Sequence, residues 1–279
     1  MALATRHASG AGLSVVGNYR EENQDAFRLP SHVPESALID HGYLWGIADG
    51  MGGYAHGGIA SNLALDVFFD AFYAASSGKA AAFKSAVQQA NVAVQREAAR
   101  LGMVRMGTTL TAVHLLGGRL SVTHIGDSRV YLVRGGQAVC LTQDHTQVGD
   151  LVRMKLLPPE KVRTHERRSH LNRAIGIQLF VQADITEHSI QPDDYLVLCT
   201  DGVWSVIEDD EFAQFVHAES EPERINERLI AEALARDSDD NASAITIHIR
   251  EIPHESASAP TGKGWSLGKL FNKRRFAGM

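Results

Sequence analysis

The sequence has few cysteines and no long apolar run. Only two of its 279 residues are cysteines, Cys140 and Cys199. A disulfide-stapled secreted scaffold is therefore excluded, and both thiols are expected to be free and buried in a reducing cytoplasm. No uninterrupted apolar stretch approaches the roughly 20 residues of a membrane span, and residues 1–12 lack the apolar core of a signal peptide. We expect a cytoplasmic protein without a membrane span.

An excess of positive charge is also missing. The chain has 27 lysines and arginines against 33 aspartates and glutamates, a net charge of −6. This balance argues against a nucleic-acid or membrane surface. The hydrophobic content of 44% is that of an ordinary globular protein, and no break in composition divides the chain before residue 252. We expect one domain over residues 1–252.

The sequence does have aspartates placed next to short apolar runs. The run Trp45–Ala48 leads directly into Asp49 and a glycine-rich turn, two later runs end at Asp127 and Asp201, and Asp240 precedes a fourth. Short apolar runs bounded by breakers are typical of buried strands. Taken singly, Asp-Gly and Gly-Asp-Ser are also ordinary turn sequences. Four strands that each carry a carboxylate predict one acidic pocket.

Helical and extended patterns surround these aspartates. Apolar residues at helical spacing predict helices at 58–75, 79–101, 209–218 and 222–235. Strand-like runs are found at 109–116, 119–125, 129–134, 138–141, 181–190, 195–200 and 243–252. The short turns between the first four of these runs predict an antiparallel meander. The basic, proline-punctuated stretch 143–176 is expected to be a surface excursion that could touch a phosphorylated partner.

An acidic pocket of this kind implies a bound cation. Clustered carboxylates repel each other unless a cation neutralises them. Oxygen ligands without a histidine or cysteine set favour Mg²⁺ or Mn²⁺ over zinc. Two such ions about 3.5–4 Å apart commonly support in-line attack of a bridging water at phosphorus. Arg20, five residues before Asp25, is the candidate for gripping the phosphoryl oxygens. These residues predict a phosphate-ester hydrolase and leave its substrate open.

Six short motifs then follow one another in the order of a known family. They are Arg20-Glu21-Glu22-Asn23-Gln24-Asp25, Asp49-Gly50-Met51-Gly52-Gly53, Gly107-Thr108-Thr109, Gly126-Asp127-Ser128-Arg129, Thr200-Asp201-Gly202 and Asp240-Asn241. Each is weak alone, but together they resemble the type 2C metal-dependent protein serine/threonine phosphatases, in a form similar to bacterial members. The resemblance implies an α+β fold, a four-layer α-β-β-α sandwich of two antiparallel sheets flanked by helix pairs.

The resemblance also implies roles for single residues. The ligands of two Mn²⁺ or Mg²⁺ ions would be Asp25, Asp49, Asp201, Asp240 and the Gly50 carbonyl. Asp127, together with Asp201, would hold a third ion. Arg20 would bind the substrate phosphate and would be catalytic together with Asp49 and Asp201.

Two positions depart from the family pattern. Gln24 stands where the family often has a glutamate that acts through a metal-bound water. Met51 stands where animal members have a histidine proposed as general acid, and neither His56 nor His145 matches that position. The general acid is therefore left open.

The activity implied is hydrolysis of phosphoserine and phosphothreonine in proteins. Bacterial members commonly oppose a serine/threonine kinase and some serve secretion-system regulation. A kinase, its substrates and secretion-system regulators are the expected partners of a monomeric enzyme. Two alternatives stay open. A non-catalytic phosphoprotein-binding regulator on the same fold would have lost a core aspartate, and a phosphodiesterase or nuclease would carry a basic, aromatic-lined surface.

The composition changes after Pro253. Residues 255–261 are rich in serine, alanine and proline, and residues 262–276 mix basic with aromatic side chains. We expect 253–279 to be a flexible basic-aromatic tail. The alternative is a short docking motif for an acidic groove or an anionic membrane surface.

Overall fold

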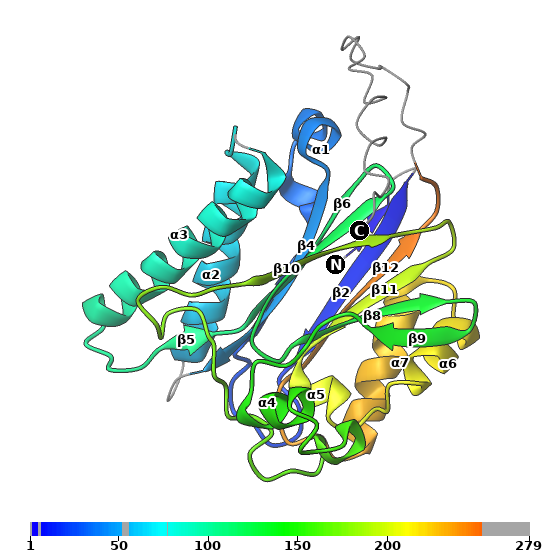
Figure 1. Ribbon diagram of the computed structural model, residues 1–279. Coiled ribbons are helices and arrows are strands. Elements are labelled where there is room, and N and C mark those ends of the chain that lie inside the picture. Colours follow the sequence, from blue (N-terminus) through cyan, green and yellow to red (C-terminus); the bar gives the residue numbers. More distant parts are fainter. Residues whose placement is uncertain (1, 5–6, 52–55, 77, 253–279) are drawn as a thin grey trace, which may run out of the picture.

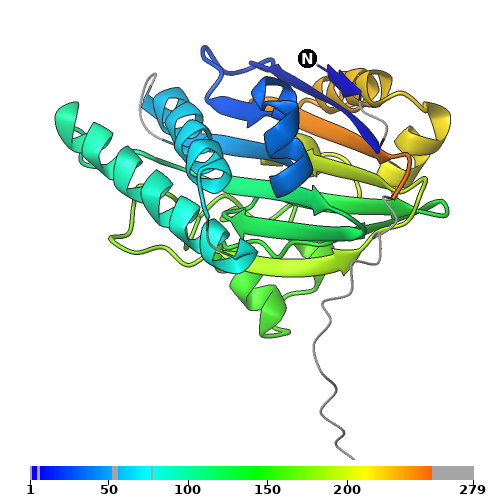
Figure 2. The ribbon, with the colours of Figure 1, turned by 90° about the horizontal axis from the view of Figure 1, so that it is seen from above.

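Two antiparallel sheets pack face to face between helices in the computed structural model, which describes residues 2–4, 7–51, 56–76 and 78–252 (Figure 1). Figure 2 shows the same layers from above, with the cyan α2 and α3 on one side and the yellow-orange α6 and α7 on the other. The expected four-layer α+β sandwich is confirmed. The tail predicted at 253–279 lies outside the described residues.

The first sheet carries the N-terminal strands and the last strand of the fold. Its strands, in spatial order, are β1 (Ala2–Ala4), β2 (Ala8–Val15), β12 (Ala242–Ile249), β11 (Tyr195–Cys199), β8 (Arg129–Arg134) and β9 (Gln137–Cys140). Its outer face packs against α6 (Glu211–Ala218), α7 (Pro222–Ala235) and the short α5 (Asp201–Trp204).

The second sheet carries the strand that ends in the glycine-rich motif. Its strands are β10 (Asp184–Ser189), β7 (Arg119–Ile125), β6 (Leu110–Leu116), β4 (Tyr43–Met51) and β3 (Asp25–Arg28), with β5 (Gly107–Thr108) paired to the end of β4. Its outer face packs against α2 (His56–Tyr73) and α3 (Lys79–Arg100). The remaining elements are α1 (Glu35–His41), α4 (Gln147–Arg153) and the 3₁₀ turns Pro30–His32 and Pro159–Lys161.

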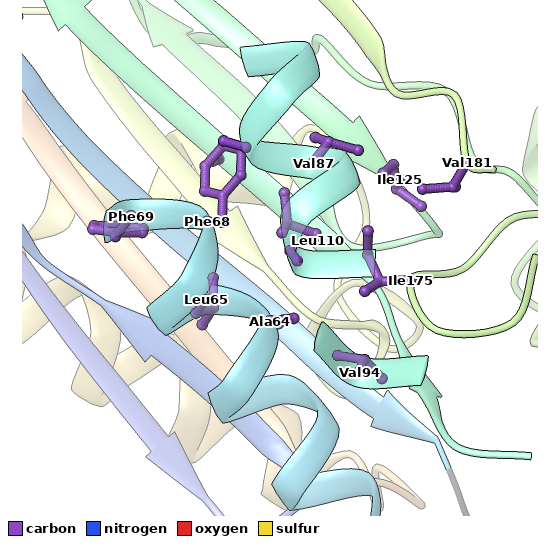
Figure 3. Close-up of a cluster of buried hydrophobic side chains, with 14 of the residues drawn as sticks. Ala64, Leu65, Phe68, Phe69, Val87, Val94, Leu110, Ile125, Ile175 and Val181 are labelled. Atoms are coloured by element: carbon purple, nitrogen blue, oxygen red, sulfur yellow. The ribbon is translucent and has the colours of Figure 1, made fainter. Parts of the chain in front are cut away.

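Strand β4 contributes side chains to two apolar layers, one on each face of its sheet. Trp45 and Ile47 belong to the apolar layer between the sheets, while Leu44 and Ala48 belong to the layer under α2 and α3. Side chains alternate across a strand, so a strand covered on both faces is apolar at successive positions. Figure 3 shows the outer layer, where side chains of α2 and α3 meet those of β6 and β7.

The predicted meander is wrong at one turn. β6 pairs with β7 and β8 pairs with β9, but β7 lies in one sheet and β8 in the other. Residues 126–128 therefore cross between sheets and do not close a hairpin. Ile125 packs in the outer core under α3, whereas Val130 packs between the sheets. Both are equally buried, so an apolar pattern alone could not separate them.

Other predictions agree to within a few residues or need small corrections. The predicted helices correspond to α2, α3, α6 and α7, and the remaining strand runs to β10, β11 and β12. The stretch 143–176 is only partly a surface excursion, because it contains α4 and the buried Val148 and Ile175. Cys199 is buried as expected, but Cys140 is only half-buried; both are free, and burial raises the pKa of both thiols. None of the helices in the described part of the chain has the length and hydrophobicity of a membrane span.

His114 is a buried imidazole that should make the domain sensitive to acid. It has no exposed surface, and it packs edge-on against the rings of Phe72 and Phe83. Burial lowers the pKa of His114 from 6.5 to about 4. Between about pH 6.5 and pH 4, His114 is therefore protonated in the unfolded chain but neutral in the folded chain. The contribution of His114 to stability should be complete above about pH 6.5 and should fall by up to about 3 kcal/mol as the pH drops towards 4.

Urea unfolding at pH 7 and pH 5 tests this expectation. The unfolding free energy of His114→Phe relative to that of the wild type should be higher at pH 5 than at pH 7, because the change removes this titrating group while the clustered aspartates titrate alike in both proteins. The exposed His217 supplies the matched control, since His217→Phe should keep the wild-type difference. An equal pH difference in wild type and His114→Phe would contradict the assignment.

Candidate metal centre

A cavity of about 990 Å³ lies where loops from both sheets meet. Asp49, Gly50 and Met51 at the end of β4 line it, together with Asp127 from the crossover between β7 and β8 and Asp201 at the start of α5. Its wall also includes residues from three loops: Tyr19, Arg20, Glu21, Glu22, Gln24, Ser169, His170, Leu171, Asp240 and Asn241. The aspartates predicted from four apolar runs therefore do share one pocket.

The strand pairings explain why these carboxylates converge. Asp25 on β3 stands directly opposite Asp49 on β4. Antiparallel pairing of β11 with β12 brings the end of one strand beside the start of the other, and so places Asp201 near Asp240. Like charges directly across a sheet are normally destabilising. Their retention at this position points to a cation that offsets the repulsion.

The five aspartates lie close enough for the charge of one to change the pKa of another. Burial, followed by the charges of Asp25, Asp201, Asp127 and Asp240, holds the pKa of Asp49 well above its usual value. Burial also raises the pKa of Asp25 to about 8 and that of Asp201 to about 6, with the neighbouring carboxylates adding to both. For Asp127, burial and then Asp201 raise the pKa well above the usual value. A divalent cation would reverse these shifts.

Two carboxylate oxygens point to a positive ion at this site, one on Asp201 in the cavity wall and one on Asp25, which pairs with Asp49 but is not among the residues that line the cavity. Oδ1 of Asp25 and Oδ1 of Asp201 are buried without a hydrogen-bond partner, whereas buried acceptors are normally satisfied. Within the described ranges, no three acidic, imidazole or thiol groups already form a compact coordination cluster. Backbone oxygen and water would have to complete the sphere, which Mg²⁺ and Mn²⁺ readily accept. The residues present fit such an ion.

Asp25 is held from the opposite sheet. Thr200 Oγ1 and Ser243 Oγ donate to its Oδ2 at 2.8 and 2.6 Å. Thr200 precedes Asp201 in the chain. This short segment therefore supplies the Asp201 carboxylate and also the hydroxyl that orients the Asp25 carboxylate. These two donors lower the pKa of Asp25 against the larger effect of burial, which favours the charged form that a metal ligand requires.

Gly50 can only be glycine. Its N–H donates to the Gln24 carbonyl at 3.1 Å, and a Cβ at this position would lie 2.0 Å from the backbone oxygen of Gly57. Close contact between β4 and the start of α2 therefore excludes any side chain. Gly50 is among the residues that line the cavity.

Asn241 braces the loop that carries Arg20, a role that sequence analysis did not assign. Its Nδ2 donates to the carbonyls of Val16 and Glu22 at 2.8 and 2.9 Å, and its Oδ1 accepts from the Gln24 amide at 2.8 Å. Its place in the Asp240-Asn241 motif was the one feature of the sequence that pointed to Asn241. Arg20 itself is about half-exposed at the cavity and pairs with Asp240 at 2.6 Å.

Several supporting contacts could not be predicted from the sequence, although Thr109 itself lies in the Gly107-Thr108-Thr109 motif. Thr109 Oγ1 accepts from the Asp49 amide at 2.8 Å, and Trp204 Nε1 donates to the Asp127 carbonyl at 2.9 Å. Ser169 Oγ donates to Asp201 Oδ2 at 3.3 Å, and its neighbour His170 lines the cavity. The loop at 154–171 thus takes part in the site.

The basic segment within that loop has fewer side chains free to contact a phosphorylated partner than its composition indicates. Arg163 is nearly buried, where it donates to the carbonyls of Trp204 and Ile207 and pairs with Asp209. Arg168 pairs with Asp239 at 3.0 Å. Most of the predicted basic surface therefore fastens the loop to the domain.

Neither of the two histidines considered from the sequence is among the residues lining the cavity. His145 is buried, its Nδ1 accepts from the Gly126 amide at 3.2 Å, and its Nε2 lies 3.2 Å from Asp184. It braces the turn that carries Asp127. His56 is the first residue of α2.

Comparisons with known proteins give a consistent result. The family model described as protein phosphatase 2C matches residues 19–236. The serine/threonine protein phosphatase PstP of Mycobacterium tuberculosis is 32% identical over 218 residues, which are 77% of this chain but only 42% of that protein. The chain thus spans less than half of that relative.

Two solved structures are similar over nearly the whole chain. The catalytic domain of a serine/threonine protein phosphatase PstP, in complex with two manganese ions, is 29% identical with a TM-score of 0.75 and covers 88% of this chain and 99% of that one. PppA, described as a key regulatory component of T6SS in Pseudomonas aeruginosa, is 30% identical with a TM-score of 0.74 and covers 87% and 98%.

Proposed function

The chain belongs to the protein phosphatase 2C family and is a metal-dependent phosphoprotein phosphatase, and from that premise we propose that it hydrolyses phosphoserine and phosphothreonine by in-line attack of water with two divalent ions in the aspartate cavity. The convergence of five aspartates from separate segments carries this proposal. All five candidate carboxylates are present, so no observation favours the non-catalytic regulator.

Each group in the cavity has a proposed task. Asp25, Asp49, Asp201, Asp240 and the Gly50 carbonyl would hold two Mn²⁺ or Mg²⁺ ions, which when bound activate water and stabilise charge that develops at phosphorus. Arg20 would hold the phosphoryl oxygens, because its pairing with Asp240 keeps the guanidinium at the cavity. Met51, whose thioether has no proton to give, cannot protonate the leaving alkoxide.

The partners remain part of the proposal. PppA, the structural relative tied to a secretion system, supports a role in secretion-system regulation, and the serine/threonine phosphatases among the relatives support opposition to a serine/threonine kinase. We place the protein in the cytoplasm as a monomer that acts on phosphorylated proteins and not on nucleic acid. Its net charge of −6 agrees with the last point.

Release of phosphate from phosphorylated proteins tests the proposal directly. A panel of autophosphorylated serine/threonine kinases and phosphorylated scaffold proteins should lose phosphate in Mn²⁺ and keep it in EDTA. Hydrolysis that continues at the same rate in chelator would overturn the metal-dependent mechanism.

Asp127 should have a weaker role than the other aspartates. If it holds only a third ion, Asp127→Ala should leave the two tight sites intact and slow turnover on the order of tenfold, since it removes charge from the edge of the cluster. Isothermal titration with Mn²⁺ and steady-state kinetics measure the two effects. Asp70→Ala, an exposed change on α2, is the matched control. Loss of tight binding would place Asp127 in the core pair, and normal kinetics would reduce it to a turn residue.

A further inference from the structure

The loop between Ile175 and Val181 presents two large apolar side chains to solvent. Leu179 is 72% exposed and Phe180 is 80% exposed. Ile175 and Val181, at the two ends of the loop, are buried in the outer core near Ile125 (Figure 3). The exposed pair is therefore carried on a segment that is anchored on both sides.

The backbone of this loop is held by side-chain amides of α3. The fully buried Asn91 donates from Nδ2 to the carbonyls of Gln178 and Leu179 at 2.9 and 3.2 Å. Its Oδ1 accepts from the Gly176 amide at 2.7 Å, and Gln95 donates to the Gln178 carbonyl at 2.6 Å. These bonds hold the backbone in place, so Leu179 and Phe180 are exposed on a loop that is tied to α3.

The loop lies beside a second exposed segment at the edge of the aspartate cavity. The antiparallel bridge between Thr108 and Ile175 joins the two segments, and Met106 and Gly107 lie against residues 175–177. Arg105 from the first segment and Gln178 from the second both line the cavity. Each has a strongly exposed apolar neighbour, and Val104 is 98% exposed. We call these exposed residues at the cavity edge, Val104, Leu179 and Phe180, the rim patch.

We propose that the rim patch binds apolar side chains next to the phosphorylated residue of the substrate protein. The inference rests on the proposed function and adds a selection rule to it. Val104 and Leu179 are the chain neighbours of the cavity-lining Arg105 and Gln178, so a polypeptide with its phosphate in the cavity can reach the rim patch. Burial of apolar surface on both partners then favours the complex. The partner is a phosphorylated segment with large apolar residues near the phosphoserine or phosphothreonine.

Two phosphothreonine peptides test the selection rule. One carries leucine and phenylalanine beside the phosphothreonine, and the other carries serine at the same positions. The wild type should show kcat/KM about tenfold higher for the apolar peptide, mainly through KM, because burial of one large side chain supplies that much binding. The double change Leu179→Ser and Phe180→Ser should remove the preference and leave hydrolysis of p-nitrophenyl phosphate unchanged.

Two exposed apolar residues outside the cavity provide the control. Ile39 on α1 is 70% exposed and Val139 on β9 is 57% exposed, and serine at both positions should preserve the preference. Equal rates on the two peptides in the wild type, or a preference that survives the rim-patch change, would overturn the proposal. So would a concentration-dependent dimer that the rim-patch change dissociates, because the occupant would then be a second copy. Failure of the wild type to hydrolyse either peptide or the aryl phosphate would overturn the proposed function itself.

Discussion

Asp49→Asn is expected to lower phosphatase turnover about a thousandfold or more, and Asp201→Asn should have a comparable effect. Each change removes a negative charge from the cluster that would hold the two ions, and the remaining amide oxygen is a weaker ligand for Mg²⁺ or Mn²⁺. Asp49 feels the charges of all four other aspartates, so it stands at the electrostatic centre of the site. EDTA should silence the wild type, and Mn²⁺ or Mg²⁺ should restore it.

Stability measurements give a readout that does not depend on activity. Without added metal, Asp49→Asn should melt at or above the wild-type temperature, because it relieves repulsion among buried carboxylates. Mn²⁺ should raise the melting temperature of the wild type, since it binds only the folded state, and raise that of Asp49→Asn much less. The exposed change Asp70→Asn should behave as wild type in both experiments. Full activity in chelator, or an unchanged Mn²⁺ response in Asp49→Asn, would refute the assignment.

Arg129→Met is expected to destabilise the domain by about 3–5 kcal/mol, because it leaves the Asp144 carboxylate buried and unpaired. Arg129 is only 7% exposed and pairs with Asp144 through two hydrogen bonds of 3.0 and 2.7 Å. Its guanidinium also lies over the Trp204 ring at 3.7 Å. The same tryptophan donates to the Asp127 carbonyl, so this change should also disturb the edge of the aspartate cavity.

A double-mutant cycle separates the charge from the packing. Arg129→Met combined with Asp144→Asn should recover part of the loss, because the second change removes the stranded charge. Arg224→Met breaks an exposed pair with Glu227 and should change the unfolding free energy by less than about 1 kcal/mol. Urea unfolding measures the wild type, Arg129→Met, Asp144→Asn alone, the double change and Arg224→Met. A loss in Arg129→Met no larger than in Arg224→Met would show that the buried pair contributes little.

Local sequence patterns identified most elements of the fold because those elements obey local rules. Helical spacing located α2, α3, α6 and α7, and apolar runs between turn residues located the central strands. The sequence patterns did not predict β1, β2, β3, β5, α1, α4 or α5. They are short, or carry small residues such as Gly10 and Gly12, whose close contacts with Trp45 and Phe27 come from tertiary packing.

The sequence by itself determined which carboxylates could form the site and, through six ordered motifs, the family. Each aspartate stands beside a strand or a glycine turn that any reader of the chain can find. Tertiary structure alone decided how the strands divide between two sheets, since strands covered on both faces are apolar throughout. It alone joined Thr200 and Ser243 to Asp25, Asn241 to the Arg20 loop, and Ser169 to Asp201. These contacts connect residues far apart in the chain, and hydrogen bonding between distant polar groups leaves no periodic trace in a sequence.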